Sequence, residues 1–389
     1  MIVGASVLQL PAILKAKEMG LHVAVVDFNP HAIGIPYADE YYNASTMDED
    51  AVLAAAEACK PDGIMTLATD MPMRGVAKTS DKLHLHNINY ETAVKATDKY
   101  DMIKAFKEHD VPSPWFFVAD SLEELKAHEQ EATFPCIIKP TDNAGSHGVA
   151  KVFSFQELID NYEYAHSCSR HGKVIVEEYL DGPEVSVEVM VVNGEVNILQ
   201  ITDKITTEAP HFVEMGHTQP SRLPDDVQKA IRNVTEAACK AIGIDKGPAH
   251  VEMKVTKRGP VMIELGARMG GDNITTHLVP LSTGIDMVGS TIKVALGEEP
   301  DIKPTFHCGS AIRYFEVPFG TIKAIEHVEV ARLVPGVKQI TFTKIVGEES
   351  TPIHCSNDRI GFVIAQGPTA EDAVKACEKA MKCIQIEIG

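Results

Sequence analysis

The chain has 389 residues, of which 44% are hydrophobic and 23% are charged, an ordinary globular composition long enough for two or three domains. Its 36 Lys and Arg against 55 Asp and Glu leave a net charge of −19, which repels phosphate backbones and anionic lipids and argues against nucleic acid or a membrane as a partner. No apolar run reaches the ~18 residues that span a bilayer. The eight scattered cysteines lack CxxC or zinc spacing, so we expect free thiols and a cytoplasmic protein.

The first 95 residues alternate between short apolar strands and helices. Met1–Val3 and His22–Val26 are typical of buried strands, followed by a helix over Asp48–Cys59 and a strand over Gly63–Leu67. Such alternation predicts a parallel sheet with helices on both faces. An NAD-dependent oxidoreductase would share this pattern, with Asp27 on a ribose hydroxyl. The first turn lacks GxGxxG, however, so a pyrophosphate could not approach its backbone closely.

The regular alternation ends near Val111–Pro114. An Asp near the start favours a helix opening at Thr97–Asp101, and Asn193-Gly194 between two apolar runs predicts a hairpin. The other elements that we expect are strands over 134–139, 173–178, 184–192, 195–201 and 310–317 and helices over 225–242 and 369–382. These changes of pattern predict three segments, 1–95, 96–295 and 296–389.

Two carboxylates face each other in a predicted hairpin over 250–265. A three-residue loop at 257–259 sets Glu252 opposite Glu264, about 5 Å apart at Cβ. Like charges in that position are destabilising unless a cation lies between them, and Mg²⁺ suits carboxylates combined with phosphates. The alternative is an exposed pair turned to solvent or to lysines. The apolar face would consist of Val251, Met253, Val255, Val261, Ile263 and Leu265.

A lysine and a glycine-bearing loop suggest contacts with phosphate. Lys139 ends an apolar strand directly before the loop 141–149, whose N–H groups could cradle phosphate oxygens. GxxxxGK[ST] is absent, so this is no P-loop, and a surface lysine beside a turn is the alternative. Residues 177–184 could meet an adenine edge and ribose hydroxyls, or form a solvated acidic turn.

Together, these segments resemble the ATP-grasp superfamily over nearly the whole chain. They are most similar to the carboxylate–amine ligases that include glycinamide ribonucleotide synthetase, N5-carboxyaminoimidazole ribonucleotide synthase, biotin carboxylase and L-amino-acid ligases. The resemblance implies an α/β protein with a Rossmann-like, parallel-sheet pre-ATP-grasp domain over 1–95, an ATP-grasp domain of two α+β lobes over 96–295, and a small biotin-carboxylase-C-like α+β domain over 296–389. It also implies ATP with one or two Mg²⁺ ions (or Mn²⁺), small-molecule carboxylate and amine substrates, and a homodimer.

The resemblance assigns roles to individual residues. Arg268 matches the arginine that steadies the acyl phosphate and the tetrahedral intermediate, and Lys139 is the second catalytic residue. Loop 141–149 matches the lid over the triphosphate. The nucleotide-binding residues that it implies are Lys99, Lys139, Gly145, Ser146, His147, Gly148, Glu177, Glu178, Tyr179, Leu180 and Glu184, and the metal ligands are Glu252 and Glu264.

One position departs from the family. ATP-grasp ligases often read Glu-x-Asn-x-Arg, with the Asn as a further metal ligand, and this chain has Gly266 there. Water, Asp272 or Asn273 would have to replace that oxygen. Asp203-Lys204 and His217–Pro220 resemble acceptor-side segments of the same enzymes, although a core or surface histidine is an equal alternative. Ser356–Ala365 resembles the strand and turn of their last domain.

The implied reaction is the attack of a substrate carboxylate on the γ-phosphate of ATP, followed by displacement of phosphate by an amine to form an amide or peptide bond. A purine-pathway ligase or formyltransferase acting on a phosphoribosyl substrate is the first alternative. Its extra phosphate would need a basic cluster, for which Arg74, Lys78 and Arg313 are scattered candidates. A regulatory protein that binds ATP without turnover is the second alternative.

Overall fold

A small parallel sheet organises the N-terminal segment. The computed structural model describes residues 1–143, 147–209 and 211–389, and in it β1 (Ile2–Val3), β2 (Ala24–Asp27) and β3 (Glu40–Asn43) pair in parallel in the order β1-β2-β3. The strand expected over 63–67 is wrong: Met65 alone pairs, in a parallel bridge with Ile2. The helices here are α1 (Leu10–Glu18), α2 (Glu49–Cys59), α3 (Met73–Leu83) and α4 (Tyr90–Thr97), with a 3₁₀ turn at Ile35–Tyr37.

The next segment forms a lobe around a four-stranded antiparallel sheet of order β4-β7-β5-β6. Helix α5 (Lys99–Glu108) precedes it and begins as expected, because the Asp98 side chain accepts hydrogen bonds from two backbone N–H groups of the first turn. The lobe consists of β4 (Phe116–Ala119), α6 (Leu122–Ala127), β5 (Cys136–Pro140), β6 (Ala150–Val152), α7 (Phe155–Ser167) and β7 (Val174–Glu178).

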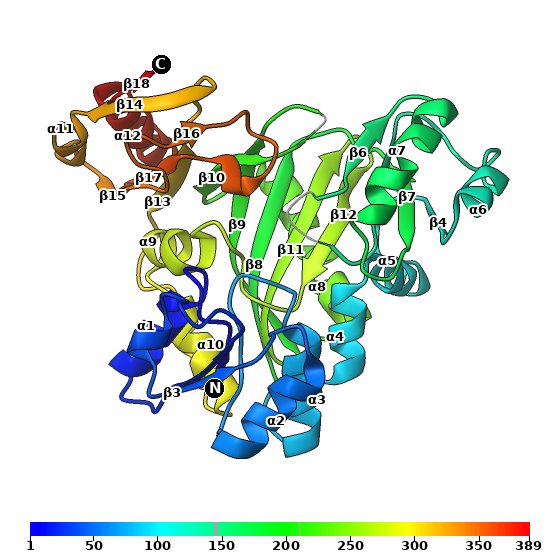
Figure 1. Ribbon diagram of the computed structural model, residues 1–389, viewed down its shortest axis with the longest axis horizontal. Coiled ribbons are helices and arrows are strands. Elements are labelled where there is room, and N and C mark those ends of the chain that lie inside the picture. The colour runs from blue at the N-terminus through cyan, green and yellow to red at the C-terminus, as the bar shows by residue number, and fades with distance from the viewer. Residues whose placement is uncertain (144–146, 210) are drawn as a thin grey trace.

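An eight-stranded antiparallel sheet of order β12-β11-β8-β9-β10-β13-β17-β15 runs through the centre of the molecule (Figure 1). Its strands are β8 (Glu184–Val192), β9 (Glu195–Thr206), β10 (Glu214–Gln219), β11 (Gly247–Thr256), β12 (Gly259–Gly266), β13 (Gly309–Tyr314), β15 (Val337–Phe342) and β17 (Gly361–Gly367). Asn193 and Gly194 have φ of 53° and 80°, which confirms the expected hairpin turn. Helix α8 (Asp225–Ile242) packs against β12, β11 and β9, and its buried side chains, among them Ile231 and Ala238, join the core there.

The last three strands of this sheet belong to the C-terminal segment, so one sheet continues across the division expected at 295/296. A second sheet of order β16-β14-β18 completes that segment. The remaining elements are a π-helix (Ile274–Leu278), α9 (Val279–Thr283), α10 (Met287–Ala295), β14 (Gly320–Glu326), α11 (Val328–Arg332), β16 (Glu349–Ser350), a 3₁₀ turn (Ser356–Asp358), α12 (Ala370–Cys383) and β18 (Gln385–Ile388). All eight cysteines are free. In the described part of the chain, no helix is both long and apolar enough to cross a bilayer.

The β11–β12 hairpin differs from the expected register near its turn. Glu252 does pair with Glu264, but Thr256 pairs with Gly259, so the loop has two residues instead of three. A bulge next to Glu252 takes up the difference, because Met253 pairs with Met262 and leaves one extra residue in β12. Met262 therefore joins the core, and Ile263 leaves the expected apolar face and is half-buried; both line one cavity.

The junction of β13 with α12 gives a test of packing. A Cβ at Gly309 would lie 1.9 Å from the backbone O of Thr369, which neither backbone can relieve. Gly309→Ala should therefore lower the free energy of unfolding by about 1–3 kcal/mol, measured by chemical denaturation. Gly75→Ala in α3 is the matched control, because its Cβ would meet nothing closer than 3.4 Å. Equal effects of the two substitutions would contradict the packing described here.

Candidate active site

A cavity of about 340 Å³ lies between the four-stranded lobe, the central sheet and the N-terminal segment. It gathers most of the residues that the sequence singled out. Those that line it are Lys99, Lys139, His147, Glu177, Glu178, Tyr179, Leu180, Glu184, Glu252, Glu264 and Arg268. Gly148 is buried against Cys168 and is not among the lining residues. Gly145 and Ser146 lie outside the described residues.

The two facing carboxylates are held by separate cations. Glu252 Oε2 lies 3.1 Å from Lys204 Nζ, and Glu264 Oε2 lies 3.1 Å from Lys99 Nζ. The Lys99 ammonium also donates to the backbone O of Asn143 at 2.8 Å. Both carboxylate side chains keep about a quarter of their surface exposed, 25% and 28%, so they remain accessible from the cavity.

Lys204 is a buried cation among three carboxylates. Its Nζ lies 2.7 Å from Glu184, 3.1 Å from Glu252 and 3.6 Å from Glu214, and its side chain is 2% exposed. Burial by itself would lower the pKa of Lys204, but these carboxylates outweigh it and hold that pKa well above its usual value. Lys204 therefore keeps its charge, and it balances part of the acidity of the wall.

Sequence reasoning missed the charge network behind Glu252. His250 Nδ1 lies 2.7 Å from Glu188 Oε1, and His250 Nε2 lies 2.9 Å from Glu252 Oε1. Burial would lower the pKa of His250, but the two carboxylates outweigh it and raise the pKa to about 9. The imidazole thus links a fully buried carboxylate to one that faces the cavity. The alternation along β11 and β8 could have suggested the pair, since His250 and Glu188 are register partners.

The end of the cavity next to β5 and β7 also holds paired charges. Lys139 Nζ lies 2.7 Å from Glu177 Oε2, and both side chains are almost completely buried. The other oxygen, Glu177 Oε1, is buried and has no hydrogen-bond partner among the residues that the structure describes, which leaves it able to accept from a ligand. Glu178 pairs with Arg258, and the Lys151 ammonium lies 3.5 Å above the Tyr179 ring.

Arg268 has a partner that no motif in the sequence indicates. Its Nη2 and Nε donate to the two carboxylate oxygens of Asp70 at 2.7 and 3.0 Å, and both side chains are 13% exposed. Asp70 lies in the turn before α3, far from Arg268 in sequence. The N-terminal segment therefore supplies one wall of the cavity and fixes its arginine.

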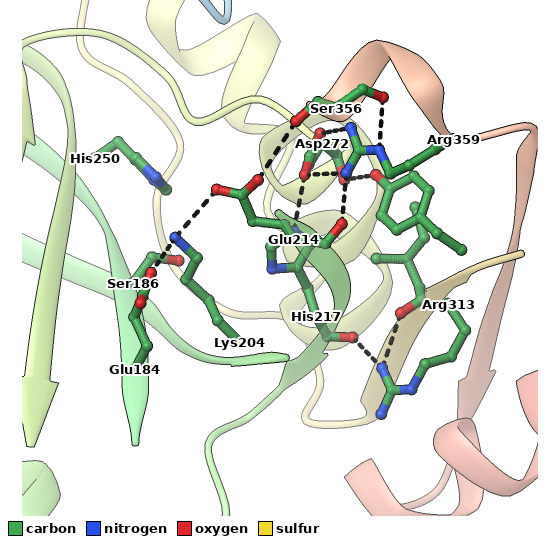
Figure 2. A network of polar contacts seen from close by, with 12 residues as sticks. Glu184, Ser186, Lys204, Glu214, His217, His250, Asp272, Arg313, Ser356 and Arg359 are labelled. Atoms are coloured by element: carbon green, nitrogen blue, oxygen red, sulfur yellow. Dashed lines mark hydrogen bonds and ion pairs between the residues drawn. The ribbon is translucent and has the colours of Figure 1, made fainter. Parts of the chain in front are cut away.

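The C-terminal segment supplies the opposite wall. Arg359 makes two hydrogen bonds to the Asp272 carboxylate, at 2.8 and 2.9 Å, and Asp272 also lies 3.1 Å from His217 Nε2 (Figure 2). The Ser356 hydroxyl reaches Glu214 at 3.4 Å. Asp272 is thus committed to Arg359 and His217, which argues against it as the replacement for the missing Asn at 266.

The three basic residues considered for the phosphate of a phosphoribosyl substrate do not form a cluster. Arg74 donates to Thr97 Oγ1, and Lys78 pairs with Asp50. Arg313 donates to the backbone O of His217 and to Thr218. None of the three lines the cavity.

The fit to a metal ion rests on the carboxylate pair alone. Among the residues described, no group of three or more His, Cys, Asp or Glu side chains is arranged to hold an ion. Two part-exposed carboxylates across a ladder do fit Mg²⁺, which is commonly held by one or two carboxylates together with substrate phosphates.

The pair between Asp272 and Arg359 makes a pH-dependent contribution to stability. Burial would raise the pKa of Asp272, but Arg359 and His217 hold that pKa far below its usual value. Its stabilising effect is therefore present above about pH 4 and is lost as the pH falls. We expect Asp272→Asn to lower the free energy of unfolding by about 2–4 kcal/mol at pH 7 and the difference from the wild type to shrink by pH 3.5.

Urea denaturation of both proteins across this pH range measures the effect. Glu371→Gln is the control, because Glu371 pairs with Lys375 at the surface, where an ion pair adds little. A difference between wild type and Asp272→Asn that stays constant from pH 7 to pH 3.5 would contradict the pairing.

Comparisons with known proteins agree with this geometry. A family model described as an ATP-grasp domain matches residues 132–277, and one described as L-amino acid ligase C-terminal domain 2 matches residues 313–389. The alanine–anticapsin ligase of Bacillus subtilis (strain 168) is 26% identical over 323 residues, which are 77% of this chain and 67% of that ligase.

Several solved structures match along the whole chain. Phosphoribosylglycinamide synthetase from Anaerococcus prevotii has a TM-score of 0.81 and 26% identity, and the match covers 100% of this chain and 98% of that protein. An L-amino acid ligase from Bacillus licheniformis shares the fold, with a TM-score of 0.85, 22% identity and the same coverage. With a match to an ATP-grasp domain at its centre and to an L-amino acid ligase C-terminal domain at its end, the chain is similar along its whole length to ligases built on the ATP-grasp domain.

Proposed function

We propose that the chain activates a small-molecule carboxylate as an acyl phosphate and transfers the acyl group to an amine, releasing ADP and phosphate. One observation carries the proposal: a single cavity brings together the carboxylate pair, two buried lysines and Arg268. A protein that only stores or senses ATP has no need of that arginine, which argues against the regulatory alternative.

In this proposal the two lysines bind the triphosphate. Lys99 and Lys139 are buried and each is held by a carboxylate, at 3.1 and 2.7 Å, so their ammonium groups are in place before nucleotide arrives. Positioned charges of this kind stabilise a transferring phosphoryl group without reorganising. Glu252 and Glu264 would hold Mg²⁺, which supplies charge neutralisation on the phosphoryl oxygens when it is bound.

In the proposal, the nucleotide base and ribose bind along the part of the cavity wall formed by residues 177–184. Residues 177–180 are the last two residues of β7 and the two that follow, and they line the cavity wall. Glu177 Oε1, which has no partner in the described part of the chain, can accept a hydrogen bond there. Glu184 lies at the start of β8 and is the candidate for the ribose hydroxyls. Residues 141–149 would cover the phosphates in this proposal, and of the described residues among them His147 lines the cavity.

Arg268 is the candidate for the oxyanion of the tetrahedral intermediate. Of its five N–H bonds, three donate to Asp70 and to the backbone O of Met269. The remaining two can meet an oxygen in the cavity. The carboxylate and amine substrates would occupy the side lined by Glu214, His217 and Ser356.

Amide or peptide bond formation is favoured over a phosphoribosyl substrate. A second phosphate group would need free cations, and the three candidates, Arg74, Lys78 and Arg313, are held away from the cavity by other partners. The match of the last segment to an L-amino acid ligase domain supports the same choice. We include in the proposal a homodimer in the cytoplasm, where eight free thiols would stay reduced.

Removing one metal-binding carboxylate tests the proposed site. Glu264→Gln should lower ATP turnover by about 10²-fold or more, because a neutral amide binds Mg²⁺ and holds Lys99 less well. Turnover is measured as ADP release, and circular dichroism checks the fold. Glu299→Gln, at an exposed position, is the control and should leave turnover unchanged. The metal assignment fails if Glu264→Gln turns over ATP at the wild-type rate, or if nucleotide binds equally tightly with and without Mg²⁺.

The substrate class is tested by ADP release with separate pools. Amino acids, other carboxylates with amines, and phosphoribosyl amines are each supplied with Mg·ATP. We expect release with a pool of carboxylates and amines that lacks phosphoribosyl groups, and a new amide in the products by mass spectrometry. Release confined to the phosphoribosyl pool would favour the purine-pathway alternative, and no release with any pool would favour the binding-only one.

A further inference from the structure

The glycine at position 266 is required by space and not by backbone conformation. It is not among the glycines with positive φ, so an ordinary side chain could adopt its backbone angles. A Cβ at this position, however, would lie 2.7 Å from Asp70 Oδ1 and 3.1 Å from Arg268 Cζ. The ion pair of Asp70 and Arg268 therefore fills the volume that a side chain at 266 would use.

The loop that carries Asp70 is itself held in one conformation. Ala68 has a φ of 61°, a left-handed conformation that costs energy for a residue with a Cβ and that occurs most often at functional sites. The backbone N–H of Met73 donates to the Asp70 carbonyl at 3.0 Å. The Asp70 carboxylate is thus presented to the cavity from a defined turn, although Asp70 and Arg268 belong to different segments of the chain.

We infer that Asp70 occupies the space that a side chain at 266 would use and acts as the positioning residue for Arg268. A chain with the pattern Glu-x-Asn-x-Arg would place its Asn side chain in this space. Here a carboxylate from the N-terminal segment lies there and binds the guanidinium, and Gly266 leaves the room for it. This inference rests on the proposed function, because it assigns Asp70 to the arginine of the same reaction.

The geometry explains why a carboxylate suits this role. Two parallel hydrogen bonds fix the plane of the guanidinium as well as its position. A third bond, from Nη1 to the Met269 carbonyl at 3.2 Å, fixes the other end. Arg268 is then oriented before the oxyanion forms, and misplacement of such a group by 1 Å can cost about 10²-fold in rate.

A double-mutant cycle tests whether Asp70 occupies the space that a side chain at position 266 would use. The variants are Asp70→Ala, Gly266→Asn and the two combined, with Gly271→Ala as a control for stability, since a Cβ there would meet only Ala68 at 3.8 Å. Without ligand, Gly266→Asn should lower the Tm by several degrees in the wild-type background and clearly less when Asp70 is Ala. Equal losses of Tm in both backgrounds would mean that Asp70 does not fill this space.

Turnover of the same variants tests the positioning role. Asp70→Ala should lower kcat of ADP release by about 10²-fold while the KM for ATP changes by less than about threefold, because the nucleotide contacts stay in place. The double variant places an amide beside the guanidinium, since a Cβ at 266 lies 3.1 Å from Arg268 Cζ, and the amide oxygen can accept a hydrogen bond from Arg268, so this variant should recover at least about tenfold of that loss. Asp70→Asn, which keeps the shape and loses the charge, should fall between wild type and Asp70→Ala.

The outcomes separate this inference from the proposed function. A wild-type kcat in Asp70→Ala, or a double variant no faster than Asp70→Ala, would overturn the positioning role. If wild-type protein releases no ADP with any substrate pool, the proposed function fails, whereas the Tm cycle still decides whether Asp70 occupies the place of a side chain at 266.

Discussion

The buried ammonium of Lys204 lies among the carboxylates of Glu184, Glu214 and Glu252, and the rest of the cavity is arranged around that contact. Charges removed from water are costly unless an opposite charge accompanies them. The same constraint recurs at Lys99 with Glu264 and at Lys139 with Glu177. Because each lysine and arginine found in the cavity lining already has a carboxylate partner, these side chains are positioned without a ligand.

The central sheet makes this pairing possible. Strands β12, β11, β8 and β9 are neighbours in that order, so side chains far apart along the chain share one face. Lys254 pairs with Glu184 across β11 and β8, and Glu252 pairs with Glu264 across β11 and β12. Consecutive antiparallel strands thus bring four acidic and basic groups within contact distance while their alternate residues form the core.

Three segments of the chain meet at the cavity. The central one provides most of the wall, and the N-terminal one contributes Asp70 against Arg268. The C-terminal one contributes Ser356 to the lining and Arg359, which binds the lining residue Asp272 (Figure 2). Each outer segment is attached by a buried ion pair. The acidic composition of the chain is therefore partly a property of this site, where carboxylates hold lysines, arginines and, in the proposed reaction, a metal ion.

Local patterns in the sequence determined the elements and the part of the site that lies within them. The alternation in 250–265 placed Glu252 opposite Glu264, and the end of an apolar strand placed Lys139, because a period of two residues and a turn signal act over short distances. Only the tertiary structure decided the pairs of Asp70 with Arg268, Asp272 with Arg359 and Glu188 with His250, which are 198, 87 and 62 residues apart. The tertiary structure alone also decided the bulge in β12 that changes the register at Ile263. These contacts depend on which strands become neighbours and on the space left between them, and a single sequence carries no local pattern for either.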